Sequence, residues 1–124
     1  MTTTLPEAGP AGMLAGLAAA GYTVEQRGEF AVFDYLIEVG SRAGETVKIG
    51  LALVQDWPLS SPPGPHVSPR LGHPHGAVHA SPLDTAGEEW EYWSRPASKW
   101  SADRTVRGYL RHLRTLFSQL EPPA

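Results

Sequence analysis

The sequence of 124 residues contains no cysteine. Disulfide bonds, zinc sites built from thiolates, iron–sulfur clusters and cysteine nucleophiles are therefore all excluded. Any chemistry at a site in this chain must instead use histidine, serine, aspartate or glutamate side chains.

Long hydrophobic runs and an excess of positive charge are also missing. No stretch is apolar over the length of a membrane-spanning helix, and the N-terminus lacks the charged and apolar regions of a signal peptide. The net charge is -3, so the overall electrostatics do not favour nucleic acid as a partner. We therefore expect a cytoplasmic protein that binds neither membranes nor nucleic acid.

The length and a hydrophobic content of 41% fit one globular domain. We expect this domain to span residues 11–120, between a flexible leader at residues 1–10 and a tail at residues 121–124.

Apolar periodicity predicts a helix followed by a β-hairpin. In residues 11–20, methionine and leucine recur at helical spacing among alanines, which favour helix. Apolar and polar residues alternate in residues 29–39 and again in residues 46–54, on either side of a turn at residues 40–45. This pattern predicts two antiparallel strands that are each buried on one face.

The second half of the chain predicts less sheet and a longer helix. Residues 56–76 are rich in proline, which lacks a backbone donor, so they predict only a short edge strand around His66 and Val67. Residues 101–120 place their leucines and other apolar side chains on one helical face, with Ser101 as the expected N-cap. The expected fold class is α+β, with a small antiparallel β-meander and a long C-terminal helix.

Two further groups of side chains recur in this half. Arginines form a stripe on another face of the predicted helix, where we expect a solvent-exposed surface. We expect most tryptophans to pack in the core, with one or two available to anchor a partner. The arginines are Arg104, Arg107, Arg111 and Arg114, and the tryptophans are Trp57, Trp90, Trp93 and Trp100.

The segment LGHPHGAVHASP places three histidines within seven positions, at His73, His75 and His79. One interpretation is a zinc site, in which the three imidazoles leave the fourth ligand position open for hydrolytic chemistry. A second is a surface that contacts a partner protein. A third is structural, with imidazoles that bond to the loop backbone and pack on prolines.

A metal-free relay is a further interpretation of the same segment. It would use His79 together with Ser81 and Asp84, in the manner of a serine hydrolase triad. Such residues are common in loops, so the spacing alone does not select this relay over the other interpretations.

The order of these segments resembles the ubiquitin-conjugating enzyme family over residues 12–120, and the bacterial conjugating-enzyme-like proteins in particular. DWPLSSPPGP resembles the family's proline-rich stretch, and WSRP resembles its tryptophan–serine–proline segment ahead of the last helix. His73 and Pro74 resemble the start of the family's histidine–proline–asparagine motif. The resemblance then places His75 at the asparagine position and His79 at the position of the nucleophilic cysteine.

The resemblance implies the scaffold, but the residues exclude thioester transfer. A thioester carrier needs a sulfur nucleophile, and an acyl-imidazole would hydrolyse too readily to replace it. The asparagine that stabilises the oxyanion is also absent from its position.

We therefore predict a non-catalytic binding or cofactor module in a bacterial ubiquitin-like pathway, without a cofactor of its own. Its expected partner is a ubiquitin-like protein or an activating-enzyme-like or ligase-like protein, contacted through His73, His75, His79 and Trp93. The alternative is a metal-dependent enzyme that uses the three histidines, with zinc as the expected metal.

Overall fold

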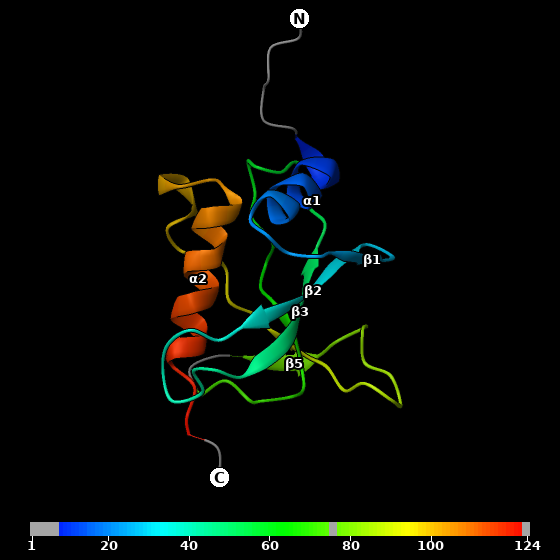
Figure 1. The fold of residues 1–124 in the computed structure, drawn as a ribbon. Helices are drawn as coiled ribbons and strands as arrows, with labels where there is room; N and C mark the ends of the chain where they lie inside the picture. The colour runs from blue at the N-terminus through cyan, green and yellow to red at the C-terminus, as the bar shows by residue number, and fades with distance from the viewer. Residues whose placement is uncertain (1–7, 75–76, 123–124) are drawn as a thin grey trace, which may run out of the picture.

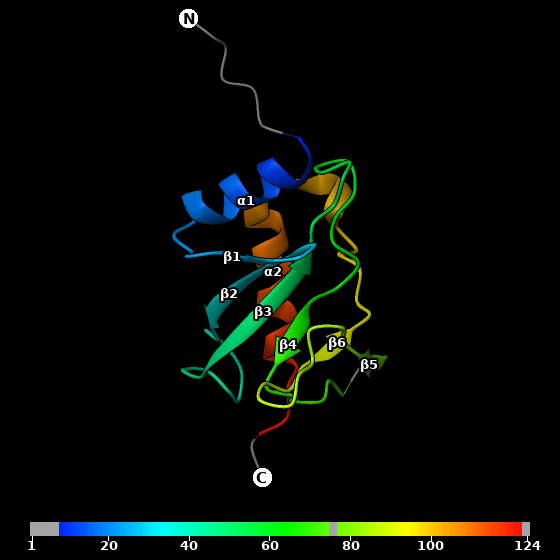
Figure 2. The same cartoon turned by 90° about the vertical axis from the view of Figure 1, so that its right-hand side faces the viewer.

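The structure, a computed structural model, describes residues 8–74 and 77–122. Six antiparallel strands form one sheet in the order β1-β2-β3-β4-β6-β5. Helix α2 runs along one face of this sheet and helix α1 lies across one end (Figures 1 and 2). The helices are α1 (Gly9–Ala19) and α2 (Val106–Ser118), with a short 3-10 helix η1 (Trp100–Ala102) before α2. The strands are β1 (Glu25–Arg27), β2 (Phe30–Leu36), β3 (Thr46–Ala52), β4 (His66–Ser68), β5 (Val78–Ala80) and β6 (Glu91–Trp93). The predicted α+β class is confirmed.

The hairpin of β2 and β3 follows the alternation in the sequence. The two strands pair antiparallel along seven consecutive residues. Tyr35 is buried and its ring lies 5.3 Å from the ring of Phe117 in α2. On the opposite face, Asp34 and Lys48 face each other in register and form an ion pair of 3.0 Å. The predicted hairpin is therefore confirmed, with slightly shorter strands.

Strand β4 has a different position from the one predicted. The strand around His66 and Val67 exists, but it lies between β3 and β6 and is not an edge strand. Pro65 and Pro69 flank it, so the three residues between them keep their backbone donors and pair on both sides. The three-residue strands β1, β5 and β6 were not predicted, since each is too short for a clear alternation.

Helix α1 begins two residues before its predicted start and ends one residue before its predicted end. Pro10 lies in its first turn, where the missing backbone donor costs nothing and the fixed φ suits a helix. Met13 and Leu17 are the large buried side chains of this helix, and they pack into the core.

Helix α2 is shorter than the predicted helix of residues 101–120. Ser101 is not its N-cap but lies in η1. Thr105 is the cap, because its backbone is extended and its hydroxyl accepts the N–H of Gly108 at 3.0 Å. Thr105 therefore fixes the start of the helix five residues later than the apolar periodicity suggested.

The proline-rich segment packs closely against the sheet. Pro62 and Pro65 are fully buried. A Cβ atom built on Gly64 would lie 2.0 Å from the carbonyl oxygen of Trp93, a contact that no larger residue could make. Glycine at this position therefore lets the segment lie directly against the end of β6, where Pro65 accepts the backbone N–H of Trp93 at 2.9 Å.

The core lies between the sheet and the two helices. The side chains that α2 contributes are Tyr109, Leu113, Leu116 and Phe117, and they pack with residues of α1, β2, β3 and β4. Within the described residues, no helix has the length and apolar character needed to cross a membrane.

Candidate functional site

The predicted site starts in the loop after β4, where His73 is buried with a side chain that is only 6% exposed. Its Nε2 lies 3.0 Å from the backbone carbonyl oxygen of Leu116 in α2, and because a carbonyl only accepts, Nε2 donates. The ring also meets Trp93 edge-on, with the ring centroids 4.9 Å apart. His73 therefore links the loop to α2 and does not offer the partner contact predicted for it.

The carboxylate of Glu91 on β6 holds the backbone just ahead of His73. One oxygen, Oε2, accepts the backbone N–H groups of Leu71 at 3.0 Å and Gly72 at 2.6 Å. The same oxygen accepts the indole N–H of Trp93 at 2.7 Å. Because Glu91 is buried, these bonds form where water screens them little. Glu91 could not be predicted from the sequence, because one glutamate in an acidic and aromatic run carries no signal of spacing.

His79, at the family's cysteine position by resemblance, lies on the edge strand β5. Its side chain is exposed, and its ring centroid lies 6.0 Å from that of Tyr92 on β6. It makes no hydrogen bond to any residue of the described chain. The imidazole at this position is thus accessible to a partner, and no acid or base among the described residues is bonded to it.

The histidines do not form a metal site from the described residues. Among residues 8–74 and 77–122, no group of three or more histidine, aspartate or glutamate side chains is placed to hold a metal ion. His75, the third ligand of the predicted zinc site, lies outside the described residues. The zinc site at His73, His75 and His79 therefore stays a prediction.

The alternative relay of His79, Ser81 and Asp84 is not formed, since the hydroxyl of Ser81 has other partners. Its Oγ lies 2.7 Å from Nδ1 of His66 in β4 and accepts the backbone N–H of Leu83 at 3.1 Å. The relay hypothesis is wrong because Ser81 is buried and its hydroxyl contacts the ring of His66, not that of His79.

The buried pair of His66 and Ser81 was not predicted from the sequence. The His66 ring stacks on Tyr92 at 4.6 Å and meets Phe30 edge-on at 4.8 Å. Burial lowers the pKa of His66 to about 4, so the imidazole is neutral at pH 7. An imidazole with this pKa is a weak general base at neutral pH. The contact between His66 and Ser81 instead holds β4 against the chain that follows β5.

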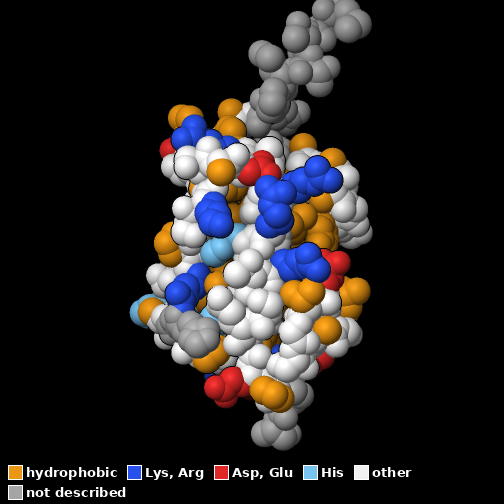
Figure 3. All heavy atoms as spheres, turned by 90° about the vertical axis from the view of Figure 1, so that its left-hand side faces the viewer, with side chains coloured by type: hydrophobic (Ala, Val, Ile, Leu, Met, Phe, Trp, Pro, Cys, Tyr) orange, Lys and Arg blue, Asp and Glu red, His pale blue; other side chains and the backbone are white. Residues whose placement is uncertain are grey.

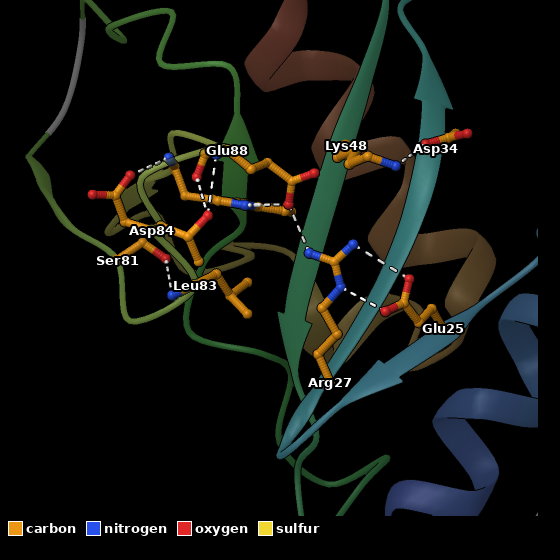
Figure 4. A network of polar contacts seen from close by, with 10 residues as sticks. Glu25, Arg27, Asp34, Lys48, Ser81, Leu83, Asp84 and Glu88 are labelled. Atoms are coloured by element: carbon orange, nitrogen blue, oxygen red, sulfur yellow. Dashed lines mark hydrogen bonds and ion pairs between the residues drawn. The ribbon is translucent and has the colours of Figure 1, made fainter.

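Carboxylates fix the loop between β5 and β6 (Figure 4). Asp84 accepts the backbone N–H of Trp90 at 2.7 Å and the guanidinium of Arg70 at 2.6 Å, and these contacts lower its pKa. Glu88 accepts the guanidinium of Arg27 at 2.7 Å and the indole N–H of Trp90 at 2.8 Å, and its pKa is also lowered. The loop beside the edge strand is thus tied to β1 on one side and to the loop after β4 on the other.

The tryptophans mainly pack in the core, as predicted. Trp57 and Trp90 are buried, and Trp100 is half-buried with its ring 5.1 Å from that of Trp57. Trp93, which we predicted to contact a partner, is 0% exposed and belongs to the core. Of the predicted contact residues within the described chain, only His79 lies at the surface.

Comparisons with protein-family models, with curated proteins and with solved structures find no match to this chain. The resemblance to conjugating enzymes therefore depends on the sequence motifs and on the order of the elements.

Proposed function

We propose that this chain is a cysteine-less conjugating-enzyme-like module. It binds a ubiquitin-like protein, or the activating- or ligase-like enzyme that handles one, without forming a thioester. The observation that carries the proposal is the position of His79. The resemblance assigns His79 to the position of the family's nucleophile, and its imidazole lies on an exposed edge strand without a hydrogen bond to the described residues. Such a residue suits recognition of a partner better than covalent catalysis.

The order of the elements supports this proposal. Helix α1 precedes four strands that are neighbours in both sequence and sheet, from β1 to β4. The histidine segment follows β4, and α2 packs over one face of the sheet (Figure 2). This is the order that the resemblance implies.

We assign strand β5 as the contact surface. All three of its residues are exposed, including Val78 at 39%, and no strand pairs with its outer side within the described sheet. An open edge strand can accept an extended segment of a partner through main-chain hydrogen bonds. Glu91 and the carboxylates of the neighbouring loop hold the backbone of the segments beside this edge, so the scaffold that carries β5 is fixed.

The test is a binding and trapping experiment on the full chain. The chain is mixed with a bacterial ubiquitin-like protein, its activating enzyme and ATP. We expect co-elution in size-exclusion chromatography and no adduct on a denaturing gel. Val78→Asp places a charge on the contact edge and should weaken binding about tenfold or more, as loss of a central interface residue does.

Leu59→Asp is the matched control, because Leu59 is also an exposed apolar residue but lies in the proline-rich segment. It should leave binding unchanged. An adduct that survives denaturation would overturn the non-catalytic proposal. Equal weakening by Leu59→Asp and Val78→Asp would show that β5 is not the contact surface.

The metal-dependent enzyme gains no support from the described residues, because His73 is buried and bonded to the carbonyl of Leu116. Elemental analysis of the purified protein tests it directly. Stoichiometric zinc that is lost in His79→Ala would replace the present proposal with that alternative.

A further inference from the structure

A cavity of about 390 Å³ lies between η1 and the outer face of α2. Helix η1 lies at the end of the molecule near α1, whereas β5 lies toward the other end (Figures 1 and 2). The lining residues that matter here are Ser98, Lys99, Trp100, Asp103, Arg111 and His112. A cavity of this volume has the size of a small-molecule site.

Most of the positive charges around this cavity have no ion-pair partner among the described residues. The four lysines and arginines before residue 95 all form ion pairs with carboxylates. Residues 95–114 contain six lysines and arginines against one aspartate, and of these six only Arg111 forms an ion pair among the described residues, with Asp103. Figure 3 shows lysine and arginine side chains gathered around a histidine on this face. The local field there favours an anion.

Arg95 adds a second observation beside the cavity. Its carbonyl oxygen accepts a hydrogen bond of 2.8 Å from Nε2 of His112, which lines the cavity. Its guanidinium nitrogens Nε and Nη2 are shielded from solvent and have no hydrogen-bond partner in the described structure. The Arg95 guanidinium does not line the cavity, but it adds one more unpaired positive charge to the chain beside it.

We infer that this cavity binds the phosphate group of a small organic phosphate. Asp103 offsets the charge of Arg111, which leaves Lys99 at the cavity, and Arg104 and Arg107 in the same stretch of chain, without an ion pair among the described residues. This excess of positive charge attracts a phosphate monoester, which carries nearly two negative charges at pH 7, more strongly than a single carboxylate. The guanidinium of Arg111, which lines the cavity, presents donors in the fork geometry that phosphate oxygens accept. Trp100 provides an apolar wall for the organic part of the ligand.

The probe for the test is phenyl phosphate, titrated into the full chain and followed by NMR through the indole N–H of Trp100. We expect a saturable shift, and binding tighter than that of inorganic phosphate or benzoate. Lys99→Ala and Arg111→Ala should each weaken phenyl phosphate binding about tenfold, which corresponds to about 1.4 kcal/mol. Both side chains are exposed, so neither change threatens the fold.

Arg114→Ala is the matched control, since Arg114 is an exposed arginine of α2 that does not line the cavity. It should change the affinity less than twofold. The inference is overturned if the shift does not saturate or if Arg114→Ala weakens binding as much as Arg111→Ala does. Equal affinity for benzoate would overturn the assignment to phosphate, and equal affinity for inorganic phosphate would overturn the organic part of the assignment.

Discussion

Strands β2 and β3 pair along seven residues, whereas β4 pairs with β6 along two residues and β5 with β6 along three. In the longer pairing, alternating apolar side chains fill the core and set the register. In the shorter pairings, buried polar groups fix the strands and the loops between them. His66 pairs with Ser81. Glu91 separately accepts the backbone N–H groups of the loop ahead of His73.

The difference shows how a sheet can continue where its strands become very short. A pairing of two or three residues has too few alternating side chains to set its register alone, so hydrogen bonds of buried polar groups also define the conformation. The hairpin of β2 and β3, the apolar half of the sheet, should therefore lose stability when side-chain volume is removed. Strands β4, β6 and β5, the polar half, should lose stability on protonation or loss of charge.

The largest effect is expected for Phe33→Ala in β2. Phe33 is buried and its ring lies 4.8 Å from that of Tyr22, so the change leaves a cavity and removes apolar burial. The free energy of unfolding should fall by about 4 kcal/mol in urea denaturation. Leu36→Ala on the same strand is the control, because Leu36 is 53% exposed and should change stability by less than about 0.5 kcal/mol.

The next effect is a dependence on pH that belongs to the polar half. Folded His66 has a pKa of about 4, below the ordinary value of 6.5, so only the unfolded chain binds a proton there between these pH values. The free energy of unfolding should therefore fall as pH decreases from about 6.5 to about 4, by about 3 kcal/mol in total.

His66→Gln, which does not titrate, should lose most of this slope in denaturation measured across the same pH range. A smaller slope of the same sign should remain, because burial also lowers the pKa of His112. A slope that is unchanged in His66→Gln would show that the His66–Ser81 pair does not account for the pH dependence.

The smallest of the three effects is expected for Glu91→Gln. The amide keeps one acceptor oxygen for Leu71, Gly72 and Trp93 but loses the charge that strengthens these bonds. The free energy of unfolding should fall by about 2 kcal/mol in urea denaturation. Glu89→Gln is the control, because Glu89 is exposed and pairs only at the surface with Arg70, so its effect should stay below about 1 kcal/mol. Equal effects of the two changes would contradict the role of Glu91.

The parts of the fold that depend on periodicity could be predicted from the amino-acid pattern. The hairpin of β2 and β3 and the existence of both helices follow from apolar spacing. The start of α2 could not be placed, because Ser101, Asp103 and Thr105 are all plausible caps and only the backbone shows which is used. The interior position of β4 depends on its pairing with β6, which is distant in sequence.

The candidate site was predicted less well, for a related reason. The histidine segment identified a region of the chain but not which imidazoles are buried, since that depends on α2 and β6. Glu91 and the pair of His66 and Ser81 come from segments with no shared pattern. The unpaired guanidinium of Arg95 likewise becomes visible only when its surroundings are known.

The exposure of β5 has a consequence for the rates at which backbone amides exchange with solvent. Because all three of its side chains are exposed, β5 can separate from β6 without opening the apolar core. Its amide protons should therefore exchange through a local opening of low free energy, whereas buried β4 should exchange only when the whole domain unfolds. An incoming strand would then meet an edge that rearranges quickly on a scaffold that opens rarely.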